Sequence, residues 1–250
     1  MNYHTLKVHL EGAVCTIQLY RPEAQNMIND VLIEECHHAL EACKEQVTVV
    51  VLEGLPEVFC FGADFHEMSN SQQHEHNPEP LYDLWNQLTS GPYITIAHVR
   101  GKVNAGGVGF VAACDLVIAD ETALFSLSEL LFGLFPACVL PFLIRRIGFQ
   151  KAHYLTLTTK PILASQALTW GLIDEMDTNS AGLLNRHLLR LRRLSKNGIM
   201  RYKKYMERLN NFLAGSKSYA LEANREIFSD TDNLLKIARY IETGKFPWEN

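Results

Sequence analysis

The sequence contains no C-x-x-C pair, and its six cysteines are scattered singly along the chain. A zinc ribbon or a disulfide framework needs cysteines at short, paired spacings, so we expect neither, and reduced thiols are the simplest interpretation. The ten histidines also lack metal-binding spacing. His37 and His38 are adjacent and would point in different directions on a helix, and His74 and His76 lie in the polar segment 69–80. We therefore expect no metal site.

Long apolar runs are also missing, since no stretch reaches the ~18 residues of a membrane span. The nearest, ELLFGLFPACVLPFLI, is interrupted by Pro136 and Pro141, and the first twelve residues lack the pattern of a signal peptide. A net charge of −5 argues against nucleic-acid binding. With 47% apolar and 20% charged residues, the 250-residue chain is expected to be a globular cytoplasmic protein of one large or two small domains.

Strand-like and helix-like segments alternate through the first part of the chain. Residues 6–20 have the pattern of a β-hairpin, and residues 47–54 and 93–99 are apolar runs typical of strands buried on both faces. Apolar residues at helical spacing lie between these runs, and from residue 149 onward the pattern is helical. This order predicts an α/β fold with a helical C-terminal region and a boundary near residue 190.

Two glycine-bearing bends, GADF and NAGGVG, each follow a predicted buried strand and open a predicted helix. The first turn of a helix offers unpaired amides, and small residues there let a ligand oxygen reach them. Two such bends facing each other could supply the amides of Ala63 and Gly106 as an oxyanion hole. The alternatives are tight turns that serve packing alone, or dinucleotide binding, because GVGFVA matches G-x-G-x-x-A. That match begins six residues after Gly101, inside the predicted helix, and is weak evidence.

One carboxyl stands alone in an apolar segment, because Glu129 is the only acidic or basic residue between Glu121 and Arg145. Loss of hydration among leucines and phenylalanines would raise its pKa toward neutrality. A carboxyl of that kind can accept and return a proton at physiological pH. The alternative is an exposed helix residue with Ser126 or Ser128 as its cap.

The segments FCFGADFHEM and GKVNAGGVGFVAACDLVIADETALFSLSELLFGLFP resemble the crotonase (enoyl-CoA hydratase/isomerase) superfamily, and the resemblance covers nearly the whole chain. It implies a ββα spiral core, residues 1–190, and a helical trimerisation region, residues 191–250, with trimers often paired into hexamers. It also implies a cofactor-free site in which the amides of Ala63 and Gly106 hold a thioester carbonyl. Of the two glutamates that the family's hydratases use, one matches Glu129 and the other falls on Gly109, which has no side chain.

The missing carboxylate leaves open which group assists Glu129. Four residues near the motifs are candidates for the substrate site: Asp64, Tyr82, Asn104 and Cys138. Each also has a simpler interpretation, with Asp64 as a helix cap and Tyr82 and Cys138 as core residues.

The segments GKVNAGG and SLSELLFGLFPACVLPFLIRRIG, together with EPLYDLW and GKFPW, are similar to the dehydratases of polyketide β-branching cassettes, such as that of the bacillaene cluster. This resemblance implies removal of water from a 3-hydroxy-3-methylglutaryl group on an acyl carrier protein, giving 3-methylglutaconyl. The alternatives are an enoyl-CoA hydratase or a decarboxylase acting on a CoA ester, and a member that only binds acyl carriers.

An acidic carrier protein would suit a local basic stripe. Nine basic residues lie between positions 186 and 208, although a solvated helix face or trimer contacts would explain them equally well. Arg100 or Lys102 could bind the free carboxylate of the substrate.

Overall fold

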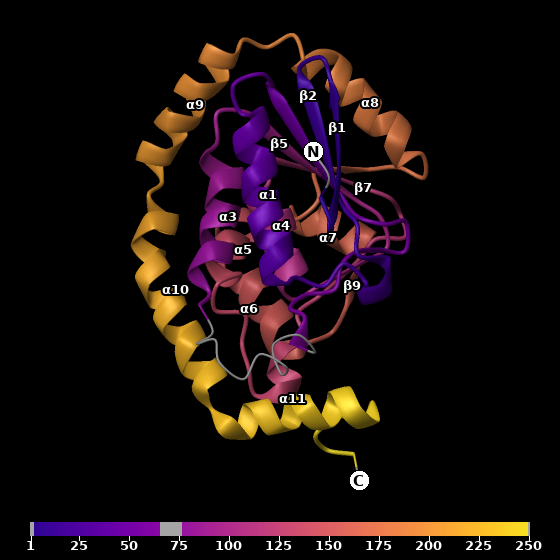
Figure 1. Ribbon diagram of the computed structural model, residues 1–250, viewed down its shortest axis with the longest axis vertical. Helices are drawn as coiled ribbons and strands as arrows, with labels where there is room; N and C mark the ends of the chain where they lie inside the picture. Colours follow the sequence, from indigo (N-terminus) through magenta and orange to yellow (C-terminus); the bar gives the residue numbers. More distant parts are fainter. Residues whose placement is uncertain (1–2, 66–76, 250) are drawn as a thin grey trace.

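The computed structural model describes residues 3–65 and 77–249 (Figure 1). Most of the polar segment 69–80, and the helix expected to open at the first bend, lie outside these ranges beyond Phe65. Within the described residues, no helix is both long and apolar enough to cross a bilayer.

A six-stranded sheet forms one layer of the core, in the order β1-β2-β3-β5-β7-β10. Its strands are β1 (Leu6–Glu11), β2 (Val14–Leu19), β3 (Val49–Glu53), β5 (Ile94–Val99), β7 (Leu116–Ala119) and β10 (Glu175–Met176). β1 and β2 form the predicted antiparallel hairpin, and the other neighbours pair in parallel. The first four residues of β3 are buried, as expected for a strand covered on both faces.

A second, four-stranded sheet has the order β4-β6-β8-β9. Its strands are β4 (Val58–Cys60), β6 (Lys102–Asn104), β8 (Leu124–Ser126) and β9 (Ile162–Leu163). The sequence predicted only β8, because two or three residues are too few to display an alternating pattern.

The chain winds as a spiral whose turns consist of two strands and a helical segment. From β3 onward, the first strand of each turn joins the larger sheet and the second joins the smaller one, as in β3 and β4, β5 and β6, and β7 and β8. This arrangement confirms the predicted α/β class and the ββα spiral.

Helices follow these strand pairs and continue to the C-terminal side. They are η1 (Pro22–Ala24), α1 (Asp30–Cys43), α3 (Glu79–Ser90), α4 (Gly106–Ala113), η2 (Glu129–Phe132), α5 (Leu140–Ile147), α6 (Phe149–Thr158), α7 (Ala164–Trp170) and α8 (Ser180–Leu191). Asn29 caps α1, since its side chain accepts a hydrogen bond from the amide of Leu32. In α4 every residue after Gly106 is buried, so small side chains let this helix lie inside the core.

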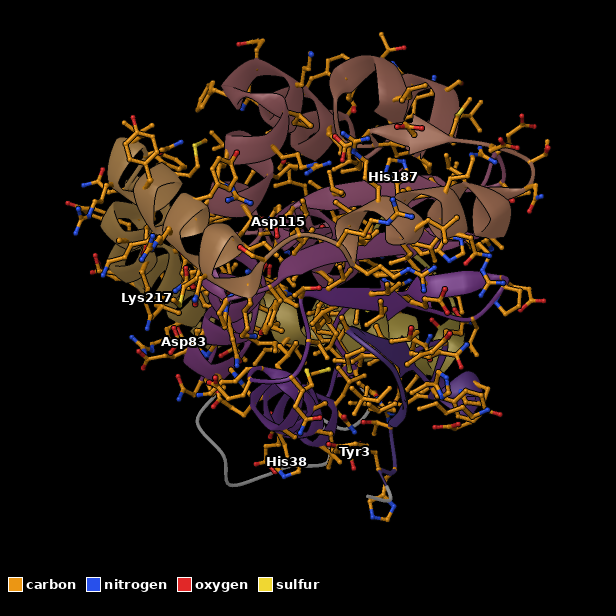
Figure 2. All side chains as sticks on the ribbon, turned by 90° about the horizontal axis from the view of Figure 1, so that it is seen from above. Tyr3, His38, Asp83, Asp115, His187 and Lys217 are labelled. Atoms are coloured by element: carbon orange, nitrogen blue, oxygen red, sulfur yellow. The ribbon has the colours of Figure 1, made fainter. Side chains whose placement is uncertain are left out.

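Three helices complete the chain: α9 (Lys196–Leu209), α10 (Phe212–Ser229) and α11 (Thr231–Thr243). α9 and α10 follow one another along one edge of the molecule, and α11 crosses its end (Figure 1). Figure 2 shows Lys217 of α10 beside Asp83 of α3, and its Nζ lies 2.7 Å from Asp83 and 2.9 Å from Glu79. These ion pairs tie α10 to α3. The predicted domain boundary between residues 190 and 191 stays a prediction.

Candidate active site

The first bend, residues 62–64, follows β4 and is held by a short parallel bridge to Ile28. The amide of Ile28 donates to Gly62 O at 2.7 Å, and the amide of Asp64 donates to Ile28 O at 2.9 Å. Successive amides in extended chain point to opposite sides, so the amide of Ala63 points away from Ile28. This amide has no acceptor among the described residues.

The second bend lies between β6 and α4, and its backbone is strained. Ala105 has φ of 49° and ψ of −121°, a conformation that costs a non-glycine residue energy and is common at functional sites. Gly106 is the first residue of α4, so its amide has no partner within the helix and none elsewhere in the described chain.

The two bends lie against each other. A Cβ placed on Gly62 would lie 2.8 Å from Ala105 Cβ and 3.7 Å from the amide nitrogen of Gly106. Any side chain at position 62 would therefore collide with Ala105 in the second bend. The tertiary fold thus brings together the two bends that the sequence analysis singled out.

Glu129 begins η2, directly after Ser128. The residue as a whole is partly exposed, yet its Oε2 atom is shielded from solvent and has no hydrogen-bond partner in the described chain. Burial raises the pKa of Glu129 from 4.5 to about 7, although the nearby amides of Glu129 and Ser128 lower it in part. The predicted rise of this pKa is confirmed, and the carboxyl is suited to both accept and release a proton near neutrality.

Asn104 connects the second bend to the segment that carries Glu129. Its Nδ2 donates to Ser128 Oγ at 2.9 Å, and its Oδ1 accepts from Ser126 Oγ at 2.8 Å. The amide of Ala105 also donates to Ser126 O at 3.0 Å. Asn104 therefore joins the second bend to Ser128, the residue directly before Glu129, through contacts that the sequence did not reveal.

The remaining candidates make internal contacts. Asp64 is almost fully buried, and its Oδ2 pairs with Nη2 of Arg21 at 3.0 Å. This ion pair anchors the first bend. The helix that Asp64 was expected to cap lies beyond the described residues. The Tyr82 hydroxyl donates to Leu213 O at 2.9 Å and joins α3 to α10. Cys138 lies in the core with a pKa raised by burial to about 12, so its thiol stays protonated. No contact in the structure tests substrate binding by these residues, which stays a prediction.

Trp85 fills the space beside Gly109, the position on which the resemblance places the second glutamate of the hydratases. A Cβ placed on Gly109 would lie 2.5 Å from Cζ2, 2.6 Å from Cη2 and 2.7 Å from Cε2 of the indole. The Trp85 side chain is 1% exposed, and its Nε1 has no hydrogen-bond partner among the described residues. This tryptophan was not singled out from the sequence, because nothing local relates position 85 to position 109.

The basic stripe predicted between positions 186 and 208 is not one surface. Lys203 is buried and pairs with Asp115 at 2.7 Å, and Lys196 donates to the carbonyl oxygens of Lys44 and Val47. α8 and α9 also lie on different sides of the molecule (Figure 1). The stripe therefore has to be corrected to separate sets of exposed basic residues.

The described residues contain no group of three or more His, Cys, Asp or Glu side chains arranged to hold a metal ion. The features of this region of the described chain that could act on a substrate are the unpaired amides of Ala63 and Gly106 and the shielded carboxyl oxygen of Glu129.

Comparison with known proteins gives consistent matches. The sequence model of the family described as enoyl-CoA hydratase/isomerase matches residues 9–250. Bacillaene synthase dehydratase PksH of Bacillus subtilis (strain 168) is 60% identical over 255 residues, covering 100% of this chain and 98% of that protein. A crystal structure described as a polyketide biosynthesis enoyl-CoA hydratase from Bacillus subtilis matches with a TM-score of 0.96 at 60% identity, covering 98% and 100% of the two chains. The 2,3-dehydroadipyl-CoA hydratase of Escherichia coli (strain K12) is 31% identical over 174 residues, 68% of each chain.

Proposed function

The chain belongs to the enoyl-CoA hydratase/isomerase family, and from that premise we propose that it is a dehydratase of polyketide biosynthesis. Its proposed substrate is a 3-hydroxy-3-methylglutaryl thioester on an acyl carrier protein, and its product is the 3-methylglutaconyl thioester. The observation that carries the proposal is the contact between the two bends, with unpaired amides at Ala63 and Gly106 and a shielded carboxyl at Glu129. The relative with 60% identity, named a dehydratase, supports the reaction class.

The two amides supply electrostatic stabilisation. The thioester carbonyl oxygen accepts hydrogen bonds from Ala63 and Gly106, and negative charge gathers on it when a proton leaves C2. One such donor typically contributes about 3 kcal/mol to transition-state stabilisation. The amides therefore make C2, which is otherwise weakly acidic, a practical site of deprotonation.

Glu129 transfers the protons. In its ionised form it removes a proton from C2, and the C–H electron pair forms the enolate. The enolate then forms the C2=C3 double bond as the C3–O bond breaks, and protonated Glu129 gives its proton to the departing oxygen, so one water leaves. A pKa of about 7 keeps both forms of Glu129 populated near neutrality. With Gly109 in place of a second carboxylate, one carboxyl serves both steps on one face of the substrate.

Mass spectrometry of the incubated substrates tests this function. We expect loss of water from 3-hydroxy-3-methylglutaryl-carrier protein, and abolition of that loss in Glu129→Gln but not in Glu121→Gln, which changes an exposed glutamate nearby. Turnover of CoA esters alone, or loss of carbon dioxide, would favour the hydratase or decarboxylase alternatives. No change in any substrate would favour a member that only binds acyl carriers, and dehydration by Glu129→Gln would reject the role of Glu129.

One face of α9 is proposed to attract the acidic carrier protein. Arg201, Lys204 and Arg208 are exposed and recur at intervals of three and four residues, so they share this face. Reversing two of these charges, Arg201→Glu with Lys204→Glu, is expected to weaken carrier binding and flatten its salt dependence. The matched control is the double variant Lys151→Glu with Lys160→Glu, which reverses two exposed charges, one within α6 and one just after it. Equal effects in both double variants would contradict docking at α9.

The neighbouring face of α9 and the start of α10 are proposed to form the homotrimer or hexamer contacts of residues 191–250. These helices expose large apolar side chains, which soluble monomers rarely gather in one patch. They are Met200, Tyr202, Tyr205, Met206, Leu209, Phe212 and Tyr219. Light scattering should give the mass of a trimer or hexamer, and Tyr205→Glu with Leu209→Glu should lower it. A monomeric wild-type protein would contradict the proposal.

A further inference from the structure

Asn104 is a polar side chain enclosed by the fold at the end of β6, and both ends of its amide are bound. Its Oδ1 accepts a hydrogen bond from Ser126 Oγ at 2.8 Å, and its Nδ2 donates to Ser128 Oγ at 2.9 Å. The whole residue is only 9% exposed. We call this three-residue connection the Asn104 bridge. An amide buried in this way is expected to serve a purpose, because buried polar groups are costly when they lose their partners.

The Asn104 bridge lies where two chain segments leave the smaller sheet together. β6 and β8 are parallel neighbours, and Asn104 stands opposite Ser126 in their register. The amide of Ala105 also donates to Ser126 O at 3.0 Å. The second bend therefore begins on one side of the bridge, and the segment that leads to Glu129 begins on the other.

On the first side, the bridge supports the strained backbone that carries the Gly106 amide. Ala105, with φ of 49° and ψ of −121°, is the single residue between Asn104 and Gly106. A conformation of this kind persists only where the surrounding structure holds it. The bonds made by the Ala105 amide and by the Asn104 side chain supply that restraint, so the direction of the Gly106 amide depends on them.

On the second side, the bridge holds the residue that precedes the carboxyl. The Ser128 side chain does not cap η2, so its hydroxyl is not used for that purpose. Its main chain opens the helical turn, because the amide of Leu131 donates to Ser128 O at 3.1 Å. The amides of Ser128 and Glu129 lie near the carboxyl and lower its pKa in part. A shift of Ser128 would therefore move the surroundings of the carboxyl as well.

We propose that Asn104 is a positioning residue that holds the Gly106 amide and the Glu129 carboxyl in one fixed arrangement. This inference rests on the proposed function and adds no chemical step to it. Charge gathers on the thioester oxygen as the proton leaves C2, so the amide and the carboxyl have to be in place at the same moment. A displacement of about 1 Å in such a site can lower the rate about 100-fold.

Steady-state kinetics of Asn104→Ala separates this role from two others. We expect kcat for dehydration of the carrier-bound substrate to fall about 10- to 100-fold while KM stays within about threefold of wild type. A residue that binds substrate directly would instead raise KM and leave kcat unchanged. A bond that serves folding alone would leave both constants unchanged in the folded variant. Either of these two results would overturn the positioning role.

Substitutions of Ser128 test whether Asn104 acts through it, and they do not disturb a fully buried side chain. Ser128→Ala should lower kcat as Asn104→Ala does, the double variant should fall no further, and Ser128→Thr should recover activity because it restores the hydroxyl. The matched control is Asn179→Ala, which removes another asparagine hydrogen bond, to the amide of Gly182 in α8, and should leave kcat unchanged. Wild-type kcat in Ser128→Ala, or falls that add in the double variant, would overturn the proposal.

A second measurement needs no substrate. In protein labelled with ¹³C at the glutamate carboxyls, the signal that is absent from Glu129→Gln belongs to Glu129, and its pKa should be about 7 in wild type. In Asn104→Ala and Ser128→Ala we expect this pKa to fall toward 4.5, because a displaced carboxyl regains water. The same pKa in all three proteins would overturn the role of Asn104. A wild-type enzyme that leaves the carrier-bound substrate intact would instead reject the proposed function, and this titration would still decide whether Asn104 holds Glu129.

Discussion

Glu129 should make the folded protein less stable as the pH rises. Burial raises its pKa from 4.5 to about 7, so between these values the folded state binds a proton that the unfolded state has already released. Stability then falls with pH, because it rises only where the unfolded state holds more protons. The stabilising effect of protonation is fully present near pH 4.5 and is lost by about pH 7.5.

The magnitude follows from the two pKa values. Each tenfold change in proton affinity corresponds to about 1.4 kcal/mol, so ionising Glu129 in the folded state costs about 3 kcal/mol. Glu129→Gln keeps the shape of the side chain and cannot ionise. We expect this variant to be more stable than wild type by up to about 3 kcal/mol at pH 8, with most of that difference gone at pH 5.

Denaturant unfolding of both proteins at pH 5 and pH 8 measures the effect. Subtracting the two free energies of unfolding at each pH removes the contributions of all other titrating groups that the variant leaves unchanged. A difference that is the same at both pH values would refute the argument that Glu129 is buried as a neutral acid. We also expect Glu129→Gln to be inactive while it is more stable, since catalytic groups are commonly held in place at a cost to folding stability.

Three further substitutions test other parts of the site and core. Gly62→Ala should lower the dehydration rate about 100-fold or more, because its Cβ would collide with Ala105 Cβ at 2.8 Å and displace the proposed oxyanion amide of Gly106, and steady-state kinetics would show a fall in kcat. Gly109→Glu should cost about 1–3 kcal/mol of stability through collision with Trp85, and Trp85→Ala in the same chain should recover part of it; additive losses in thermal unfolding would contradict this packing. Lys203→Met should cost about 1–3 kcal/mol because it removes the only ion-pair partner recorded for Asp115 among the described residues, while Thr95 still donates to that carboxylate; adding Asp115→Asn should recover part of the loss in denaturant unfolding, and a neutral single variant would show that the pair does not hold α9.

Local patterns in the sequence were enough to predict the class of fold. The alternating hairpin, the doubly apolar strands and the helical spacing after residue 149 are short-range features, and they report burial and period directly. The raised pKa of Glu129 was predictable for the same reason, because its neighbours along the chain are apolar. The short strands of the second sheet were mostly missed, since two or three residues carry no period.

By itself, the sequence determined the α/β alternation of strands and helices, the two small-residue bends and the isolated carboxyl, because each is encoded in a run of neighbouring residues, whereas the spiral followed only from the family resemblance. Only the tertiary structure decided what those parts meet. Arg21 holds Asp64, and Asn104 joins one bend to the segment of Glu129. Trp85 takes the place left by Gly109. These contacts join residues 20 to 45 positions apart, and such distances close only when the sheets and helices pack, so no local pattern announces them.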